Sequence, residues 1–272
     1  MYDYHIHTDF SGDCVEAMED TILAAIKRGG KQVCFTDHLD YDYPTTEIEF
    51  DFDAHAFSDE LERMQLKYGD QIQVQKGIEI GLQPHITEMC DSFIKQFKPD
   101  FVLCSFHVAD RKDLYNGDFY RHKSPVEAWH HYFKDVLETL KKFKNYSVVG
   151  HLDIPKRYDK DTKSVVIEVY KEELTQVLKQ IIKDGKGIEV NMSGLRTEMN
   201  ETLPNTSILS LYHALGGQYI TLGSDAHRKE DVYSHYYDVL KTLQDIGFKS
   251  FTRYENQEPI QCSIREALDQ MI

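Results

Sequence analysis

The sequence contains no long apolar run and no leader-like start. Hydrophobic residues make up 41% of its 272 residues, but none of their runs approaches the roughly 18 residues of a membrane span. The first residues lack the basic and apolar stretches of a signal peptide. We therefore expect a cytoplasmic protein without a membrane partner.

Paired cysteines and basic patches are also missing. The five cysteines are scattered and form no CxxC pair, which is typical of reduced thiols and makes them poor candidates for metal ligands. The formal net charge is −15, and the densest basic pairs, Lys141-Lys142 and Lys156-Arg157, are too short for a nucleic-acid surface. No nucleic-acid partner is expected, and bound cations would offset part of the acidic charge.

Three common functional motifs are absent. There is no HExxH segment, so the chain is not a zinc protease of that class. There is neither a Walker loop nor a GxGxxG turn, so a nucleotide cofactor is not indicated.

The chain alternates between short buried runs and longer amphipathic ones. Strands are predicted at residues 2–5, 33–36, 72–80, 101–106, 147–150, 187–191 and 219–223, and helices at 15–28, 54–67, 85–97, 126–144, 163–183, 207–215 and 231–246. Such βα units favour a single α/β domain over residues 1–272, a distorted (β/α)7 barrel, with an open doubly wound sheet as the alternative. In either fold, functional side chains gather at the carboxyl ends of the strands.

Metal-ligand residue types stand at these strand ends. All the predicted strands except the one ending at Asn191 deliver a His, Asp or Glu: His5, His7, His38, Glu79, His107, His151, Asp225 and His227. Carboxylates that converge in this way repel one another unless cations neutralise them. Imidazole and carboxylate ligands without thiolate suit Zn²⁺, Mn²⁺ or Fe²⁺.

As a set, these motifs resemble the polymerase and histidinol phosphatase (PHP) superfamily. HxH, TDH, a Glu, SxH, GHLD and GSDAH follow one another in that order between His5 and His227. The resemblance implies a distorted (β/α)7 barrel with up to three divalent metals, and the single-domain length points to its histidinol-phosphatase branch. The resemblance places one metal on His5, His7, Glu79 and Asp225, a second on Glu79, His107 and His151, and a third on His38 and His227.

One position departs from the family pattern. Many members have a His six residues after the second His of HxH, where this sequence has Asp13. A carboxylate can replace an imidazole at a metal, so Asp13 is kept as a predicted ligand of the third site.

The resemblance also implies residues that act beside the metals. Arg157 and Arg196 are expected to bind the phosphate, with Lys156 and Ser193 as weaker candidates. Asp37 and Asp153 are expected to orient neighbouring imidazoles. Asp225, or His227 if it holds no metal, is the expected group that serves the leaving alkoxide.

The predicted reaction is hydrolysis of a phosphomonoester, most specifically L-histidinol phosphate. Its ammonium and imidazole groups would suit an acidic and aromatic wall, for which Asp40 and Tyr115 are predicted contacts. His85 and His122 stand in loops that could also face the pocket.

Four alternatives stay open. They are a PHP enzyme for another small ester or for phosphotyrosine, an exonuclease, an amidohydrolase, and a noncatalytic metal-binding regulatory protein. The charge of −15 disfavours the exonuclease. An amidohydrolase would need a bridging lysine or its equivalent after the fourth strand, whereas the bridging candidate here, Glu79, follows the third.

Overall fold

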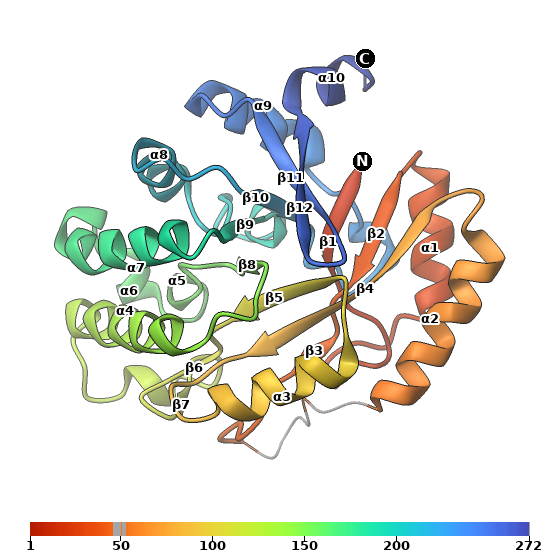
Figure 1. Cartoon of the computed structure of the whole chain (residues 1–272). Helices are drawn as coiled ribbons and strands as arrows, with labels where there is room; N and C mark the ends of the chain where they lie inside the picture. Colours follow the sequence, from red (N-terminus) through yellow and green to blue (C-terminus); the bar gives the residue numbers. More distant parts are fainter. Residues whose placement is uncertain (46–49, 51–52, 272) are drawn as a thin grey trace.

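A parallel sheet that nearly closes into a barrel forms the centre of the molecule (Figure 1). The computed structural model describes residues 1–45, 50 and 53–271. In spatial order the strands are β1 (Tyr2–Ile6), β2 (Gln32–Phe35), β4 (Gln73–Gly81), β5 (Phe101–Ser105), β8 (Val148–Val149), β9 (Gly187–Asn191) and β10 (Ile220–Gly223). The short strand β3 (His38–Leu39) pairs with β4 beside β2.

Backbone hydrogen bonds join the two ends of this sheet. The N–H of Asp225 donates to the carbonyl of His5 at 2.8 Å, and the N–H of His7 donates to the carbonyl of Ala226 at 2.9 Å. The segment after β10 therefore pairs with the end of β1. This closure confirms the predicted (β/α)7 barrel over the open, doubly wound sheet.

Amphipathic helices surround the strands. The longer ones are α1 (Met18–Lys27), α2 (Ala54–Tyr68), α3 (Thr87–Phe97), α4 (Pro125–Lys142), α7 (Lys171–Lys183), α8 (Thr206–Ala214) and α9 (Tyr236–Ile246). Helix α7 shows the pattern clearly, because its buried residues Leu174, Val177, Leu178 and Ile181 form one face at helical spacing. Within the described residues, no helix combines the length and the apolar character of a membrane span.

Two predicted helices begin later than expected. Residues 160–170 form the short helix α6 (Lys160–Lys163) and the 3-10 turn η2 (Ile167–Val169) before α7 starts. Ahead of α9 stands a second turn, η4 (Lys229–Asp231), and His235, which precedes the helix, has a positive φ of 59°. That left-handed backbone interrupts the helical pattern.

Smaller elements fill the loops at the carboxyl ends of the strands. They are β6 (Val108–Ala109), β7 (Lys112–Asp113), η1 (Asp118–Tyr120), α5 (Pro155–Tyr158) and η3 (Ser193–Arg196). Strands β6 and β7 pair as a tight hairpin in the loop after β5.

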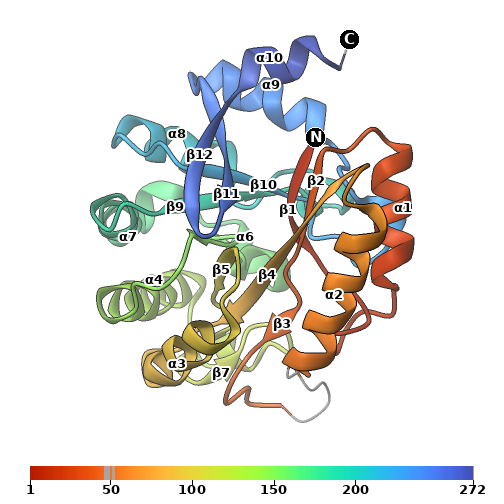
Figure 2. The ribbon, with the colours of Figure 1, turned by 45° about the vertical axis from the view of Figure 1, so that its right-hand side comes forward.

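The chain ends in a hairpin that the βα pattern did not predict. Strands β11 (Ser250–Glu255) and β12 (Glu258–Ser263) are antiparallel, and α10 (Ile264–Asp269) follows them. The hairpin crosses the barrel (Figure 2), and the N–H of Gln257 in its turn donates to the carbonyl of Asp100 just before β5. Tyr254 packs there with Tyr4, Phe101, Leu103 and Val148, so an apolar plug fills the amino-terminal end of the barrel.

Candidate metal centre

Nine side chains with metal-binding atoms meet at the carboxyl end of the barrel. Four overlapping groups, in each of which the ligand atoms lie within 4.8 Å of one another, contain His5, His7, Asp13, His38, Glu79, His107, His151, Asp225 and His227. These are the nine residues predicted as ligands from the sequence. They come from β1, β3 and β4 and from the loops after β1, β5, β8 and β10, because the carboxyl ends of the strands meet at one end of the barrel.

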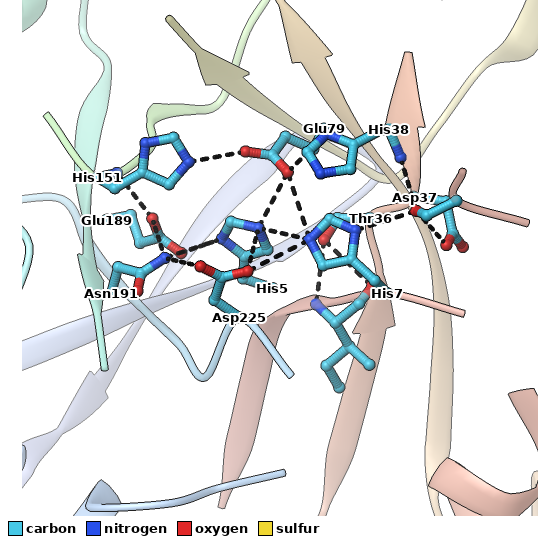
Figure 3. Close-up of polar contacts among 12 residues, drawn as sticks. His5, His7, Thr36, Asp37, His38, Glu79, His151, Glu189, Asn191 and Asp225 are labelled. Atoms are coloured by element: carbon cyan, nitrogen blue, oxygen red, sulfur yellow. Dashed lines mark hydrogen bonds and ion pairs between the residues drawn. The ribbon is translucent and has the colours of Figure 1, made fainter. Parts of the chain in front are cut away.

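Glu79 on β4 lies at the centre of the cluster. Its Oε2 is 3.1 Å from Nε2 of His5 and 3.3 Å from Nδ1 of His38. Its Oε1 is 2.9 Å from Nε2 of His151 and 3.3 Å from Nε2 of His107. Figure 3 shows this carboxylate between His151 on one side and His38 on the other. A carboxylate placed in this way could bridge two cations.

His5, His7 and Asp225 form a group in which all three residues are buried. The Nε2 atoms of His5 and His7 are 2.9 Å apart, and each is 3.5 Å from Oδ1 of Asp225. Ligands of a tetrahedral zinc, with bonds of roughly 2.0–2.1 Å, lie about 3.3 Å from one another. The spacing and the chemistry of these donors therefore fit a divalent cation.

The outer group consists of His7, Asp13, His38 and His227. Oδ2 of Asp13 is 3.3 Å from Nε2 of His227 and 3.6 Å from Nε2 of His38. The Asp13 side chain is 28% exposed, whereas Glu79 is fully buried. The structure thus places Asp13 where the sequence predicted a ligand, in the part of the cluster nearest to solvent.

The ionisable groups of the cluster shift one another's pKa values strongly. Burial lowers the pKa of His5, but the carboxylates of Glu189, Glu79 and Asp225 raise it well above its usual value. Burial and the neighbouring charges of His227 and His38 lower the pKa of His7 to about 3. Burial raises the pKa of Asp225, but the charge of His5, a hydrogen bond with His7 and the charge of Arg157 hold it well below its usual value. The buried carboxylates thus draw positive charge into this site, the place that a divalent cation would take.

Glu189 on β9 was missed by the sequence analysis. Its Oε1 accepts a hydrogen bond from Nδ1 of His5 at 2.6 Å, and its Oε2 accepts one from the N–H of His151 at 2.8 Å. Asn191 extends the network, since its Nδ2 donates to Oδ2 of Asp225 at 3.2 Å. The strand that was expected to bring no acidic or imidazole side chain to the cluster therefore orients two of the predicted ligands (Figure 3).

Asp37 supports the loop that follows β1. It accepts hydrogen bonds from the N–H of Thr8 and from Oγ of Ser11, both at 2.7 Å. Oγ of Ser11 lies in turn 3.1 Å from Nδ1 of His7. Burial raises the pKa of Asp37 to about 6 against these hydrogen bonds. Its influence on the imidazoles passes through Ser11.

Asp40 and Asp153 have partners other than those expected. Asp40, predicted to contact substrate, is buried, and its Oδ2 lies 2.6 Å from Nδ1 of His107, which favours a role in orienting that ring. Asp153, predicted to orient His151, instead pairs with Nζ of Lys156 at 2.6 Å. The Nδ1 atom of His151 has no hydrogen-bond partner among the described residues.

The two predicted phosphate-binding arginines differ in their surroundings. Arg157 on α5 lines the cavity beside the cluster, where it donates to Oγ of Ser193 and lies 3.4 Å from Oδ2 of Asp225. Arg196 on η3 donates to the carbonyls of Ser224 at 2.7 Å and Asp225 at 3.0 Å. It lines a second hollow together with Arg157, so its guanidinium is partly engaged in holding the loop after β10.

A cavity of about 340 Å³ opens beside the predicted ligands. Besides seven of those ligands, its wall includes Tyr43, Phe50, Asp113, Tyr115, Arg157 and Tyr158. Tyr115 thus lies where a substrate contact was predicted. His85 and His122 are not among the described residues that line it, and His85 pairs with Asp42 instead.

Comparisons with known proteins agree with this arrangement. The model of the PHP domain family matches residues 3–193. A histidinol-phosphatase of Lactococcus lactis is 28% identical over 258 residues, covering 94% of this chain and 95% of its own. A probable histidinol-phosphatase of Clostridium acetobutylicum is 30% identical over 251 residues, covering 92% and 95%.

A solved structure is similar along nearly the whole length. The histidinol phosphate phosphatase of Lactococcus lactis, complexed with zinc, L-histidinol and phosphate, superposes with a TM-score of 0.88 at 27% identity. It covers 95% of this chain and 98% of its own. Because the family model matches more than half of the sequence and these relatives align almost from end to end, the chain belongs to the PHP domain family.

Proposed function

We propose that this chain is a metal-dependent phosphomonoesterase that hydrolyses L-histidinol phosphate to L-histidinol and phosphate. One observation carries the proposal: the fold shared with a zinc-, L-histidinol- and phosphate-bound phosphatase extends over 95% of the chain. The cluster of nine ligand-type residues beside a cavity provides the chemistry that such a reaction requires.

The donor set suits two or three divalent cations. Imidazole and carboxylate atoms without thiolate favour Zn²⁺, Mn²⁺ or Fe²⁺. His5, His7 and Asp225 would hold one cation, and the outer group with Asp13 would hold another. Glu79 would share the first cation with one on His107 and His151, whose Nε2 atoms both lie near its Oε1. When bound, such cations activate water and offset the charge of the phosphate.

The remaining residues would bind and orient the ester. Arg157 lines the cavity, where Ser193 and Asp225 hold its guanidinium, and this group suits the nonbridging oxygens of a phosphate. Asp225 and His227 line the same cavity. His227, if it holds no metal, could pass a proton to the leaving alkoxide. Asp225, whose pKa is held well below its usual value, could serve the alkoxide only through its charge and contacts.

The test is phosphate release by the purified protein with Zn²⁺ or Mn²⁺ supplied. L-histidinol phosphate is compared with a panel of other phosphomonoesters, including phosphotyrosine. Selective turnover of L-histidinol phosphate that disappears with a chelator is expected. Turnover of other esters alone would overturn the substrate, and bound metal without any turnover would point to the noncatalytic alternative.

A further inference from the structure

The loop after β5 places a buried carboxylate in the wall of the cavity. Asp113 on β7 is only 1% exposed and lines the cavity with the predicted ligands. Its Oδ1 accepts hydrogen bonds from the hydroxyl of Tyr43 at 2.9 Å and from the N–H of Tyr115 at 2.6 Å. Its Oδ2 has no hydrogen-bond partner among the described residues. A buried oxygen left in this state is costly unless something else meets it.

Aromatic rings surround this carboxylate. Tyr43 packs against Phe50 with ring centroids 4.8 Å apart, and Tyr115 packs edge to face against Tyr158 at 5.6 Å. All four rings line the same cavity. The faces of such rings attract cations, and a carboxylate among them strengthens that attraction. This part of the cavity wall therefore favours a positively charged group.

Tyr43 sets the direction of the carboxylate. Burial, followed by the charge of Asp113, raises the pKa of Tyr43 above its ordinary value. The hydroxyl therefore keeps its proton and donates a hydrogen bond to Oδ1 of Asp113, while the buried Oδ2 has no partner among the described residues. The cavity therefore has a negative group, Asp113, and a positive group, Arg157, in its wall.

We propose that Asp113, surrounded by Tyr43 and Tyr115, binds a cationic nitrogen of the substrate while the metal centre and Arg157 hold its phosphate. This inference rests on the proposed phosphomonoesterase activity and adds a determinant of its specificity. A substrate with a phosphate at one end and a cation near the other would enter in a single orientation, because each end meets its opposite charge.

The test replaces Asp113 by asparagine and compares phosphate esters with and without each of the two cationic groups. Asp113→Asn keeps Oδ1 as an acceptor for Tyr43 and Tyr115 but removes the negative charge. L-histidinol phosphate is compared with its des-amino analogue, with the amino ester that lacks the imidazole, and with a neutral phenylpropyl phosphate. The control, Asp118→Asn, removes a charge from the same loop at a 43% exposed position paired with Arg121.

We expect Asp113→Asn to lower kcat/KM for L-histidinol phosphate by roughly 30-fold or more, mainly through KM, as removal of one partner of a buried charge pair does. The neutral ester should be turned over as by wild type, which also reports that the variant is folded. The cationic ester that loses activity identifies the nitrogen recognised. Asp118→Asn should change none of these values.

Equal losses for the cationic and neutral esters, or no loss for either, would overturn the inference and leave the proposed function intact. Wild-type protein that releases no phosphate from any ester would instead overturn the proposed function. If Asp113→Asn does not fold, Asn116→Asp adds a carboxylate to the same wall. This variant should increase the preference for cationic esters over the neutral ester, and an unchanged preference would contradict the inference.

Discussion

Glu189 orients two imidazole-bearing residues through opposite oxygens of one carboxylate. Its Oε1 receives the Nδ1–H of His5, so Nε2 of that ring is the nitrogen that would bind a metal. Its Oε2 receives the N–H of His151. One carboxylate therefore contacts both residues, and its contact with Nδ1 favours metal binding through Nε2 of His5.

We predict that Glu189→Gln weakens metal binding by roughly 10- to 100-fold, the usual cost of losing such a supporting contact. The amide can present its oxygen to only one of the two donors, and an NH₂ group facing Nδ1 of His5 would move the proton to Nε2. The affinity is measured by titrating zinc into chelator-buffered protein and reading the bound fraction.

The matched control is Glu173→Gln. Glu173 makes the same kind of contact, 2.7 Å from Nδ1 of His130, but on the surface between α4 and α7. This variant should bind zinc like wild type. Equal affinities for the two variants would show that Glu189 does not act through His5.

Arg157 and Arg196 should separate into a phosphate contact and a loop support. Arg157→Ala should reduce kcat/KM by roughly 100- to 1000-fold, as removal of one charge-stabilising donor does, and should raise the inhibition constant of inorganic phosphate. Arg196→Ala should lower the melting temperature more, because it loses bonds to the carbonyls of Ser224 and Asp225. Phosphate inhibition and thermal unfolding are measured on both variants.

If Arg196→Ala raises the phosphate inhibition constant as much as Arg157→Ala does, and its melting temperature is unchanged, both arginines bind phosphate. That result would restore the original expectation from the sequence, in which the two had the same role.

At single residues, ligand types could be predicted but their partners could not. The nine residues stand at strand ends, and a barrel brings strand ends together whatever the details of packing. Which oxygen meets which imidazole depends on side-chain direction, which short-range sequence does not determine; Asp153 accordingly pairs with Lys156. A signal for Glu189 did exist, since it shares a strand face with Asn191 and lies between the buried Ile188 and Val190.

At the scale of elements, the C-terminal hairpin closes the barrel at the end away from the metal centre. The hydroxyl of Tyr4 donates to the carbonyl of Tyr254 at 3.0 Å, and Nε2 of Gln75 donates to the same oxygen at 2.7 Å. The hydroxyl of Tyr254 donates to the carbonyl of Ser147 at 3.2 Å. The regular βα repeat predicted the seven barrel strands. It did not predict the antiparallel pair β11 and β12, because this pair belongs to no βα unit.

We predict that Tyr254→Ala lowers the free energy of unfolding by about 3–5 kcal/mol, the range for a large aromatic ring removed from a core. Tyr254 is 2% exposed and fills the plug with Tyr4 and Phe101. Chemical denaturation measures the change. Below the melting temperature, KM should be unaffected, because the printed partners of Tyr254 (Tyr4, Gln75, Phe101 and Ser147) are not among the nine predicted ligands.

Tyr237→Ala is the control for that substitution. Tyr237 lies on α9 and is 39% exposed, so its removal should cost less than about 0.5 kcal/mol. A loss below about 1 kcal/mol for Tyr254→Ala would contradict a plug that stabilises the barrel.

At the scale of the whole molecule, the candidate metal centre lies where the first and last strands of the barrel meet. His5 and His7 come from the β1 end of the sheet and Asp225 from the β10 end, and backbone bonds join the two ends beside them. Cations held there would tie both ends of the sheet together. They would also offset part of the net charge of −15, which otherwise opposes the compact state.

We therefore predict that metal removal lowers thermal stability as well as activity. A ligand at 100 times its Kd adds about 2.7 kcal/mol for each site, which corresponds to a shift of roughly 5 to 10 °C for a domain of this size. Melting curves with a chelator and with zinc measure this shift.

Asp13→Asn, in the exposed outer group, should lose about one bound metal by elemental analysis yet keep most of the shift in melting temperature. The control His131→Ala, on the surface, should keep both the bound metals and the shift. Identical melting temperatures with chelator and with zinc would contradict a structural contribution of the metals and leave them a purely chemical one.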